Sequence, residues 1–179
     1  MYIEGWKDGG VLFSAEQIGK RVRELGEQIS GDYRGREILA VGVLKGAFVF
    51  MADLVRCIEG DVRLDFIAAS SYGSGDKSSG VVKIKKDLST NPEGKNILLI
   101  EDIADTGNTL KYLKDVYLPG KGASSVKICT LLDKPARRVV DVILDYCGFE
   151  IEDKFVIGYG LDYAEYGRNM PEIRYLIKE

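Results

Sequence analysis

Apolar runs of strand length alternate with helical patterns along this chain, and this alternation constrains its fold more than any other feature. Strands are expected over 38–44, 62–69, 81–86, 96–100, 125–132, 139–145 and 155–159. Helices are expected over 14–29, 47–58 and 109–118. Buried strands that alternate with helices predict an α/β fold, with a mostly parallel central sheet flanked by helices. The length predicts that residues 1–179 form a single domain.

Three polar clusters each follow one of the expected buried strands. These clusters are Lys45-Gly46, the stretch from Glu101 to Thr109, and Asp133-Lys134. Ligands of open parallel sheets bind outside the carboxyl ends of the strands. The three clusters therefore predict one ligand site at that edge of the sheet.

The chain contains no histidine, and this excludes several kinds of chemistry. Ser-His-Asp catalysis, histidine metal ligands and imidazole acid–base catalysis are all impossible without it. Its three cysteines are odd in number, widely spaced and form no C-x-x-C pair, and without a histidine to activate a thiol we expect no nucleophilic cysteine. Acid–base work must then fall to carboxylates, lysine or tyrosine, and any metal should be a hard cation bound by oxygen.

Charge and hydropathy bear on partners and location. The net charge is −3, so no overall field attracts nucleic acid or an anionic membrane. No apolar run approaches the ~20 residues needed to span a bilayer. The first residues show neither the basic nor the apolar region of a secretion signal. We therefore expect a cytoplasmic protein without nucleic-acid or membrane partners.

The segment Asp105-Thr106-Gly107-Asn108-Thr109 has the composition of a phosphate-binding loop. Glycine permits close backbone approach, and the start of the following helix would offer free N–H groups to an anion. The segment matches neither a Walker A loop nor G-x-G-x-x-G, and an ordinary turn before a capped helix needs the same residues. The adjacent carboxylates of Glu101 and Asp102 favour the phosphate interpretation, since they suit a ribose diol and Mg²⁺. Strand alternation would aim these two side chains in opposite directions, so we expect the chain to leave the strand there.

Residues 98–110, Leu-Leu-Ile-Glu-Asp-Ile-Ala-Asp-Thr-Gly-Asn-Thr-Leu, resemble the phosphoribosyl pyrophosphate (PRPP) motif of type I phosphoribosyltransferases. Over nearly its whole length, the chain resembles the bacterial hypoxanthine phosphoribosyltransferases in particular. The further matching stretches, in the order of that family, are residues 43–46, 70–75, 131–135 and 155–163. The resemblance implies the type I fold with a small hood region and a flexible lid loop.

The implied activity is transfer of the 5-phosphoribosyl group from PRPP to hypoxanthine, and also to guanine, in purine salvage. The products would be IMP or GMP and pyrophosphate, with Mg²⁺ as cofactor. The partners would be these small molecules, and the chain would form a homodimer or homotetramer.

The resemblance also implies roles for individual residues. PRPP would contact Lys45, Gly46, Glu101, Asp102, Asp105, Thr106, Gly107, Asn108, Thr109 and Arg168. The purine would contact Ile103, Lys134, Phe155, Val156 and Asp162. The metal would be held by or through Glu101, Asp102 and Asp162, and the lid would carry Ser71 and Tyr72. Asp105 would be the catalytic residue that takes or shares the purine N7 proton, and the peptide between Leu44 and Lys45 would be cis.

Each of these residues also has an ordinary structural interpretation. Asp105 could cap the following helix, Phe155 could be a core residue, and Lys45, Lys134 and Arg168 could be plain surface cations. Two functional alternatives stay open as well. One is a non-catalytic regulator that keeps the PRPP-binding fold and controls nucleic-acid association. The other is a transferase that prefers guanine, xanthine or a pyrimidine.

Overall fold

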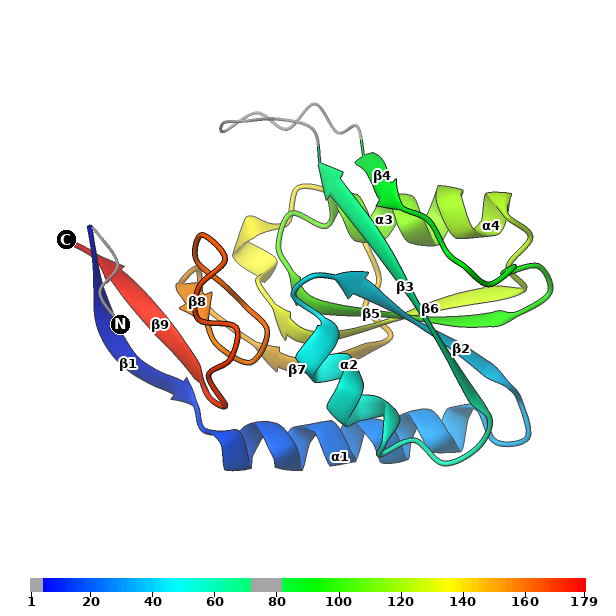
Figure 1. The fold of residues 1–179 in the computed structure, drawn as a ribbon, viewed down its shortest axis with the longest axis horizontal. Coiled ribbons are helices and arrows are strands. Elements are labelled where there is room, and N and C mark those ends of the chain that lie inside the picture. The colour runs from blue at the N-terminus through cyan, green and yellow to red at the C-terminus, as the bar shows by residue number, and fades with distance from the viewer. Residues whose placement is uncertain (1–4, 72–81) are drawn as a thin grey trace.

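The computed structural model describes residues 5–71 and 82–179 and is built around a six-stranded sheet (Figure 1). Its strands, in spatial order, are β4 (Val82–Lys86), β3 (Val62–Ser71), β2 (Ile38–Leu44), β5 (Asn96–Ala104), β6 (Ser125–Asp133) and β7 (Tyr146–Glu150). All neighbouring strands are parallel except β4, which runs antiparallel to β3 at one edge. The expectation of a mostly parallel sheet is confirmed.

A second, three-stranded sheet lies at one end of the molecule and joins the two ends of the chain (Figure 1). Its order is β1 (Trp6–Phe13), β9 (Ile173–Lys178) and β8 (Phe155–Ile157), and both pairings are antiparallel. It corresponds to the hood that the resemblance implied. The sequence patterns had indicated a strand at 155–159 but neither β1 nor β9.

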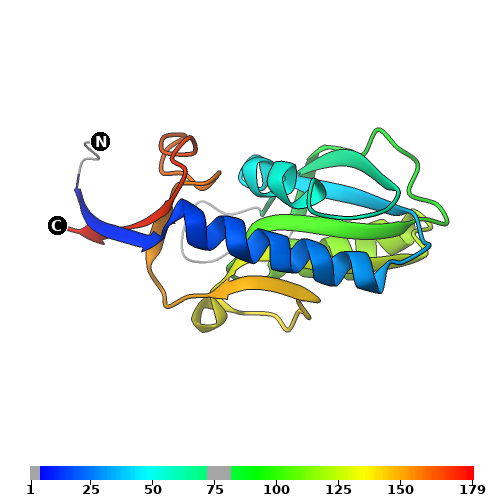
Figure 2. The same ribbon diagram turned by 90° about the horizontal axis from the view of Figure 1, so that it is seen from below.

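Helices cover both faces of the large sheet. Helix α1 (Ala15–Asp32) runs across one face, as Figure 2 shows from below, and α2 (Phe48–Val55) packs beside it. Ser14 and Gln17 form a reciprocal capping box at the start of α1. The other face is covered by α3 (Asn108–Tyr112), a π-helical turn η1 (Leu113–Tyr117) and α4 (Leu118–Gly120). A short 3₁₀ turn, η2 (Pro135–Arg137), follows β6.

Alternation along β5 explains how the sheet divides the core into two layers. Leu98 and Ile100 are buried against the α1 and α2 side, whereas Ile97 and Leu99 are buried on the α3 side. Both faces of this strand are therefore apolar, as central strands of parallel sheets require.

Several expected boundaries were wrong. The strand expected over 139–145 is irregular, because Val139 and Ile143 are 65% and 71% exposed and the β7 pairing begins only at Tyr146. Helix α2 ends at Val55 rather than near residue 58, and β5 continues beyond residue 100 to Ala104.

One buried carboxylate ties a long connection to the sheet. Asp65 on β3 accepts hydrogen bonds from the backbone N–H groups of Phe66, Ser89 and Thr90, at 2.7, 2.8 and 2.6 Å. Burial alone would raise the pKa of Asp65, but these hydrogen bonds outweigh burial and hold the pKa below its usual range. The ionised side chain thus fixes the segment after β4.

None of the helices in the described part of the chain is both long and apolar enough to cross a membrane.

Candidate active site

The three polar clusters lie next to one another at the carboxyl edge of the large sheet. β2, which ends before Lys45, is the neighbour of β5, and β5 is the neighbour of β6, which ends before Lys134. This is the arrangement expected from the sequence. Two cavities open beside this edge.

The first cavity, of about 240 Å³, is formed by the segment after β5. Its lining residues are Glu101, Ile103, Asp105, Thr106, Gly107, Thr109 and Leu110. Gly107 adopts a left-handed φ of 85° and occupies the N-cap position of α3, which begins at Asn108. Backbone N–H groups of Val139 and Val140 donate to the carbonyl of Thr106 and brace the loop from outside. Asp105 is therefore not the N-cap residue of this helix.

The two adjacent carboxylates lie within β5 rather than beyond it. Glu101 pairs with Thr130 and Ile103 with Leu132, so the expectation that the chain leaves the strand at this point was wrong. Glu101, Ile103 and Asp105 line the first cavity, and Asp102 lies against the loop after β2. The two carboxylates nevertheless stay close together, because the Asp102 N–H donates to a Glu101 carboxylate oxygen at 3.3 Å. Burial raises the pKa of Glu101, and the neighbouring carboxylate of Asp102 adds to that rise. Burial also raises the pKa of Asp102, although its hydrogen bonds with Glu101 and with the Ile103 N–H, and then the charge of Arg168, partly oppose this rise.

The loop after β2 fits closely against Asp102. A Cβ atom on Gly46 would lie 1.5 Å from the Asp102 Oδ2 atom, so a larger residue there would displace the Asp102 carboxylate. A Cβ atom on Gly160 would in turn lie 2.1 Å from the Gly46 carbonyl oxygen. The peptide between Leu44 and Lys45 is cis, which confirms the expectation from the resemblance.

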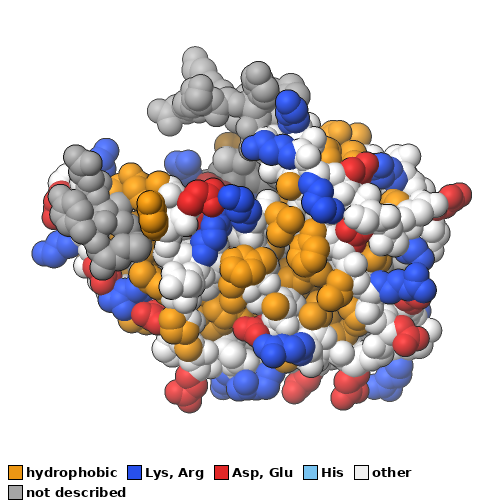
Figure 3. Space-filling model, viewed as in Figure 1, with side chains coloured by type: hydrophobic (Ala, Val, Ile, Leu, Met, Phe, Trp, Pro, Cys, Tyr) orange, Lys and Arg blue, Asp and Glu red, His pale blue; other side chains and the backbone are white. Residues whose placement is uncertain are grey.

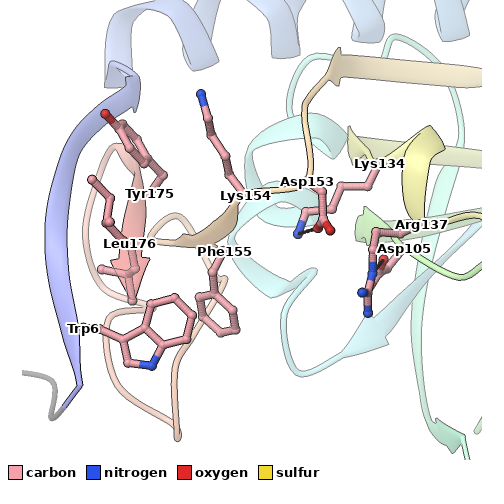
Figure 4. A pocket seen from close by; sticks show the side chains of 10 residues that line it. Trp6, Asp105, Lys134, Arg137, Asp153, Lys154, Phe155, Tyr175 and Leu176 are labelled. Carbon is pink, nitrogen blue, oxygen red and sulfur yellow. Dashed lines mark hydrogen bonds and ion pairs between the residues drawn. The ribbon is translucent and has the colours of Figure 1, made fainter. Parts of the chain in front are cut away.

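The second cavity, of about 520 Å³, lies between the large sheet and the small one. Its lining residues are Trp6, Asp105, Lys134, Arg137, Asp153, Lys154, Phe155, Tyr175, Leu176 and Ile177 (Figure 4). Lys134 is 8% exposed, and its ammonium group lies 3.6 Å from an Asp153 carboxylate oxygen. Phe155 keeps 38% of its surface exposed, so its ring is available to a ligand. The core interpretation of Phe155 is therefore not supported.

Asp105 lines both cavities and is the residue that links them. Its carboxylate lies 3.4 Å from the Nε atom of Arg137. Both side chains are about half exposed, so a ligand can reach this ion pair.

A charged network surrounds the turn after β8. Arg168 donates to the Gly160 carbonyl at 2.8 Å and pairs with Asp162 at 2.7 Å. The exposed carboxylate of Glu165 lies 2.9 Å from the Lys45 ammonium and 3.4 Å from Arg168. The hydrogen bond from Lys45 lowers the pKa of Glu165. The Glu165 carboxylate thus bridges Lys45 and Arg168, two of the residues that the resemblance assigned to PRPP binding.

Some assigned residues occupy less direct positions. Ile103 lines the first cavity with the phosphate loop, and not the second cavity with Phe155. The side chain of Val156 is buried, so its contact with a base would come from the backbone of β8. Among the lid residues, Ser71 is the last residue of β3, and Tyr72 lies outside the described residues.

Several site residues had no sequence assignment. In the second cavity these are Trp6, Arg137, Asp153, Lys154, Tyr175, Leu176 and Ile177. Most of them come from the small sheet or from the segment leading into it. Because this sheet pairs strands from the two ends of the chain, no short stretch of sequence indicates that these residues meet. The position of Arg137 three residues after Lys134 was the one local hint.

The donor set suits a hard cation. Glu101 offers oxygen ligands in the first cavity, Asp102 offers them beside the loop after β2, and Asp162 offers another beside Arg168. Within the described residues, no three acidic or cysteine side chains converge into a metal cage. Mg²⁺ characteristically binds one or two carboxylates together with substrate phosphates, and these residues fit that pattern.

Together, the fold and the two adjoining cavities at the carboxyl edge of the sheet define the kind of site that α/β enzymes carry. The phosphoribosyl transferase domain model matches residues 10–164. The chain belongs to the phosphoribosyltransferase family.

Individual relatives place the chain more narrowly within that family. It is 53% identical over 163 residues to a hypoxanthine-guanine phosphoribosyltransferase of Bacillus subtilis, which covers 91% of this chain and 90% of that one. A Streptococcus thermophilus protein of the same name is 50% identical over 94% of this chain and 93% of its own. The crystal structure of a Staphylococcus aureus hypoxanthine phosphoribosyltransferase superimposes with a TM-score of 0.91 at 45% identity, over 95% of this chain and 92% of that one.

Proposed function

We propose that this chain transfers the 5-phosphoribosyl group of PRPP to hypoxanthine, and also to guanine, in purine salvage. The products are IMP or GMP and pyrophosphate. The names of the relatives at about 50% identity support this activity. The observation that carries the proposal is the position of Asp105, which lines both the phosphate cavity and the base cavity.

The 5′-phosphate would bind in the first cavity, against the backbone and hydroxyl groups of Thr106 to Thr109. Glu101 and Asp102 would face the ribose hydroxyls. Lys45, the Gly46 backbone and Arg168 would meet the pyrophosphate, whose departure leaves a ribose with oxocarbenium character. Such a reaction depends on positioning and on neutralising the leaving group.

The purine would bind in the second cavity and stack on Phe155. Lys134 supplies only donors, so its ammonium group would favour a 6-oxo over a 6-amino base. Ile103 would border the base from the phosphate side, and the Val156 backbone would read its edge. Asp105 would take or share the N7 proton as N9 attacks the sugar, a role for which a carboxylate is the available group in a chain without histidine.

Mg²⁺ would be held through Glu101, Asp102 and Asp162 together with substrate oxygens, and it would neutralise charge on the pyrophosphate. The partly buried pair Glu101 and Asp102 is costly to ionise without a cation nearby, as the raised pKa values indicate. Bound PRPP with its metal would relieve this cost.

The deciding experiment is an initial-rate comparison of hypoxanthine, guanine, xanthine, adenine and uracil with PRPP and Mg²⁺. We expect hypoxanthine and guanine to be used well, and adenine and uracil poorly. A dominant rate with xanthine or uracil would overturn the proposed base preference. No turnover with any base, despite PRPP binding, would favour the non-catalytic regulator.

The charge distribution gives the regulator less support. On the face shown in Figure 3, lysine and arginine side chains are interspersed with aspartate and glutamate, and no continuous basic stripe runs across it. From the resemblance we also propose a cytoplasmic homodimer or homotetramer. Light scattering after gel filtration would measure the oligomeric state.

A further inference from the structure

We infer that Trp6, from the first strand of the chain, is a positioning residue for the purine because it holds the ring of Phe155 in its stacking orientation. The inference rests on the proposed function and adds a residue to the base half of the site. The base cavity is lined by Trp6 as well as by Asp105, Lys134 and Phe155.

The small sheet places Trp6 on the same face as Phe155. Phe155 pairs with Leu176 of β9, and Leu176 pairs with Asp8 of β1. Paired residues of antiparallel strands share a face, and so do residues two apart on one strand. Trp6 and Asp8 therefore lie on the face that carries Phe155.

Three aromatic rings contact one another on this face. The centroids of Trp6 and Phe155 are 5.0 Å apart, those of Phe155 and Tyr163 are 5.5 Å apart, and those of Trp6 and Tyr163 are 6.0 Å apart. These are favourable distances for tilted and edge contacts. In Figure 4, Phe155 stands between Trp6 and the group formed by Lys134 and Asp105.

Phe155 needs such support because burial does not fix it. With 38% of its surface exposed, its ring is not enclosed by core atoms and depends on its neighbours for its angle. A base stacks well only on a ring that already has the right orientation, since ordering the ring on binding would cost affinity. Trp6 provides that restraint from the side away from Lys134, and Tyr163 adds an edge contact to the same ring.

The test measures steady-state kinetics for Trp6→Leu and Trp6→Phe. Removing the ring should raise KM for hypoxanthine about three- to tenfold and leave KM for PRPP within about twofold. The phenylalanine variant should recover part of this loss. Phe13→Leu is the matched control, because Phe13 lies on the same strand and stacks on Phe149 at 4.0 Å, outside both cavities.

Fluorescence gives a second readout, since Trp6 is the only tryptophan of the chain. Binding of IMP should change its emission, and Phe155→Leu should reduce that change. An unchanged KM for hypoxanthine in Trp6→Leu, with a melting temperature lowered as in Phe13→Leu, would overturn the inference and leave the proposed function intact. Absence of purine-dependent turnover in the unaltered enzyme would instead refute the proposed function.

Discussion

Replacing Asp105 with asparagine separates the catalytic role of this residue from its structural ones. The substitution keeps the shape of the side chain and removes its charge. The structural loss is the ion pair to Arg137, in which both side chains are about half exposed, and such pairs contribute about 0–1 kcal/mol. For a chain of this length that corresponds to a melting shift of at most about 4 °C. The N-cap of α3 is unaffected because Gly107 occupies it.

The chemical loss should be much larger. Removing a general base typically lowers a rate by about 10²–10⁴-fold, or about 3–5 kcal/mol of transition-state stabilisation. We therefore expect near-native melting, near-native PRPP affinity and a kcat lower by at least about tenfold. The assay is initial rates at saturating PRPP and hypoxanthine, with calorimetry for PRPP binding.

Arg137→Gln is the matched control for this experiment. It breaks the same ion pair but keeps the carboxylate of Asp105. A kcat that falls equally in both variants would mean that the ion pair, and not the base, matters. A stable Asp105→Asn enzyme with full activity would refute the catalytic role altogether.

Four further outcomes are expected. Excess EDTA with metal-stripped PRPP should abolish turnover, and full activity there would contradict a Mg²⁺ requirement. Lys134→Gln should lower kcat/KM for hypoxanthine by about one to two decades, since losing the ammonium donor to the buried 6-oxo group costs about 1–3 kcal/mol. The affinity for PRPP, measured by calorimetry, should stay near native. Glu165→Gln should lower KM for PRPP about two- to fivefold, with less effect at high salt, because the Glu165 carboxylate pairs with both Lys45 and Arg168, which are proposed to meet pyrophosphate. A raised KM would mean that Glu165 orients these two cations instead. Glu172→Gln is the control, because Glu172 pairs with Arg174 and lies outside both cavities. Because the pKa of Asp65 is lowered, its contribution to the stability of the fold is complete above the usual aspartate range and is lost as the pH falls through the lowered value. Asp65→Asn should therefore lower the free energy of unfolding, measured in urea at neutral pH, by about 1–3 kcal/mol. The stability of the variant should also depend less on pH in the acid range.

The large sheet could be predicted because its signals are local. In β5, both alternating sets of side chains are apolar, which is typical of a central parallel strand. The polar residues after β2, β5 and β6 then had to meet at one edge, and they do. The capping box formed by Ser14 and Gln17 is an equally local signal for the start of α1.

The missed elements depend on contacts between distant parts of the chain. β1 contains Gly9, where a Cβ atom would lie 2.2 Å from the ring of Tyr175, so its glycine reflects packing by β9 and not a turn. The apolar segment 139–145 has the composition of a strand but no strand partner. It packs instead beside Gly107, where a Cβ atom would lie 3.0 Å from the Val142 side chain, and its backbone donates to the Thr106 carbonyl, so it supports the loop from Asp105 to Thr109. No pattern within residues 139–145 distinguishes a strand of the sheet from an irregular segment that packs on a loop.

The two halves of the site belong to different sheets, and this has a consequence for how such an enzyme can change. The cavity proposed for the phosphate is lined by the end of β5 and the segment that follows it, whereas much of the cavity proposed for the base is supplied by β1, β8, β9 and the segment before β8. Substitutions confined to the terminal strands, or replacement of these strands by those of a relative, would alter which base is accepted without changing the residues proposed to bind the sugar phosphate. The architecture thus allows substrate choice to diverge as a separate module, in nature or by engineering, while the chemistry at the sugar carbon stays the same.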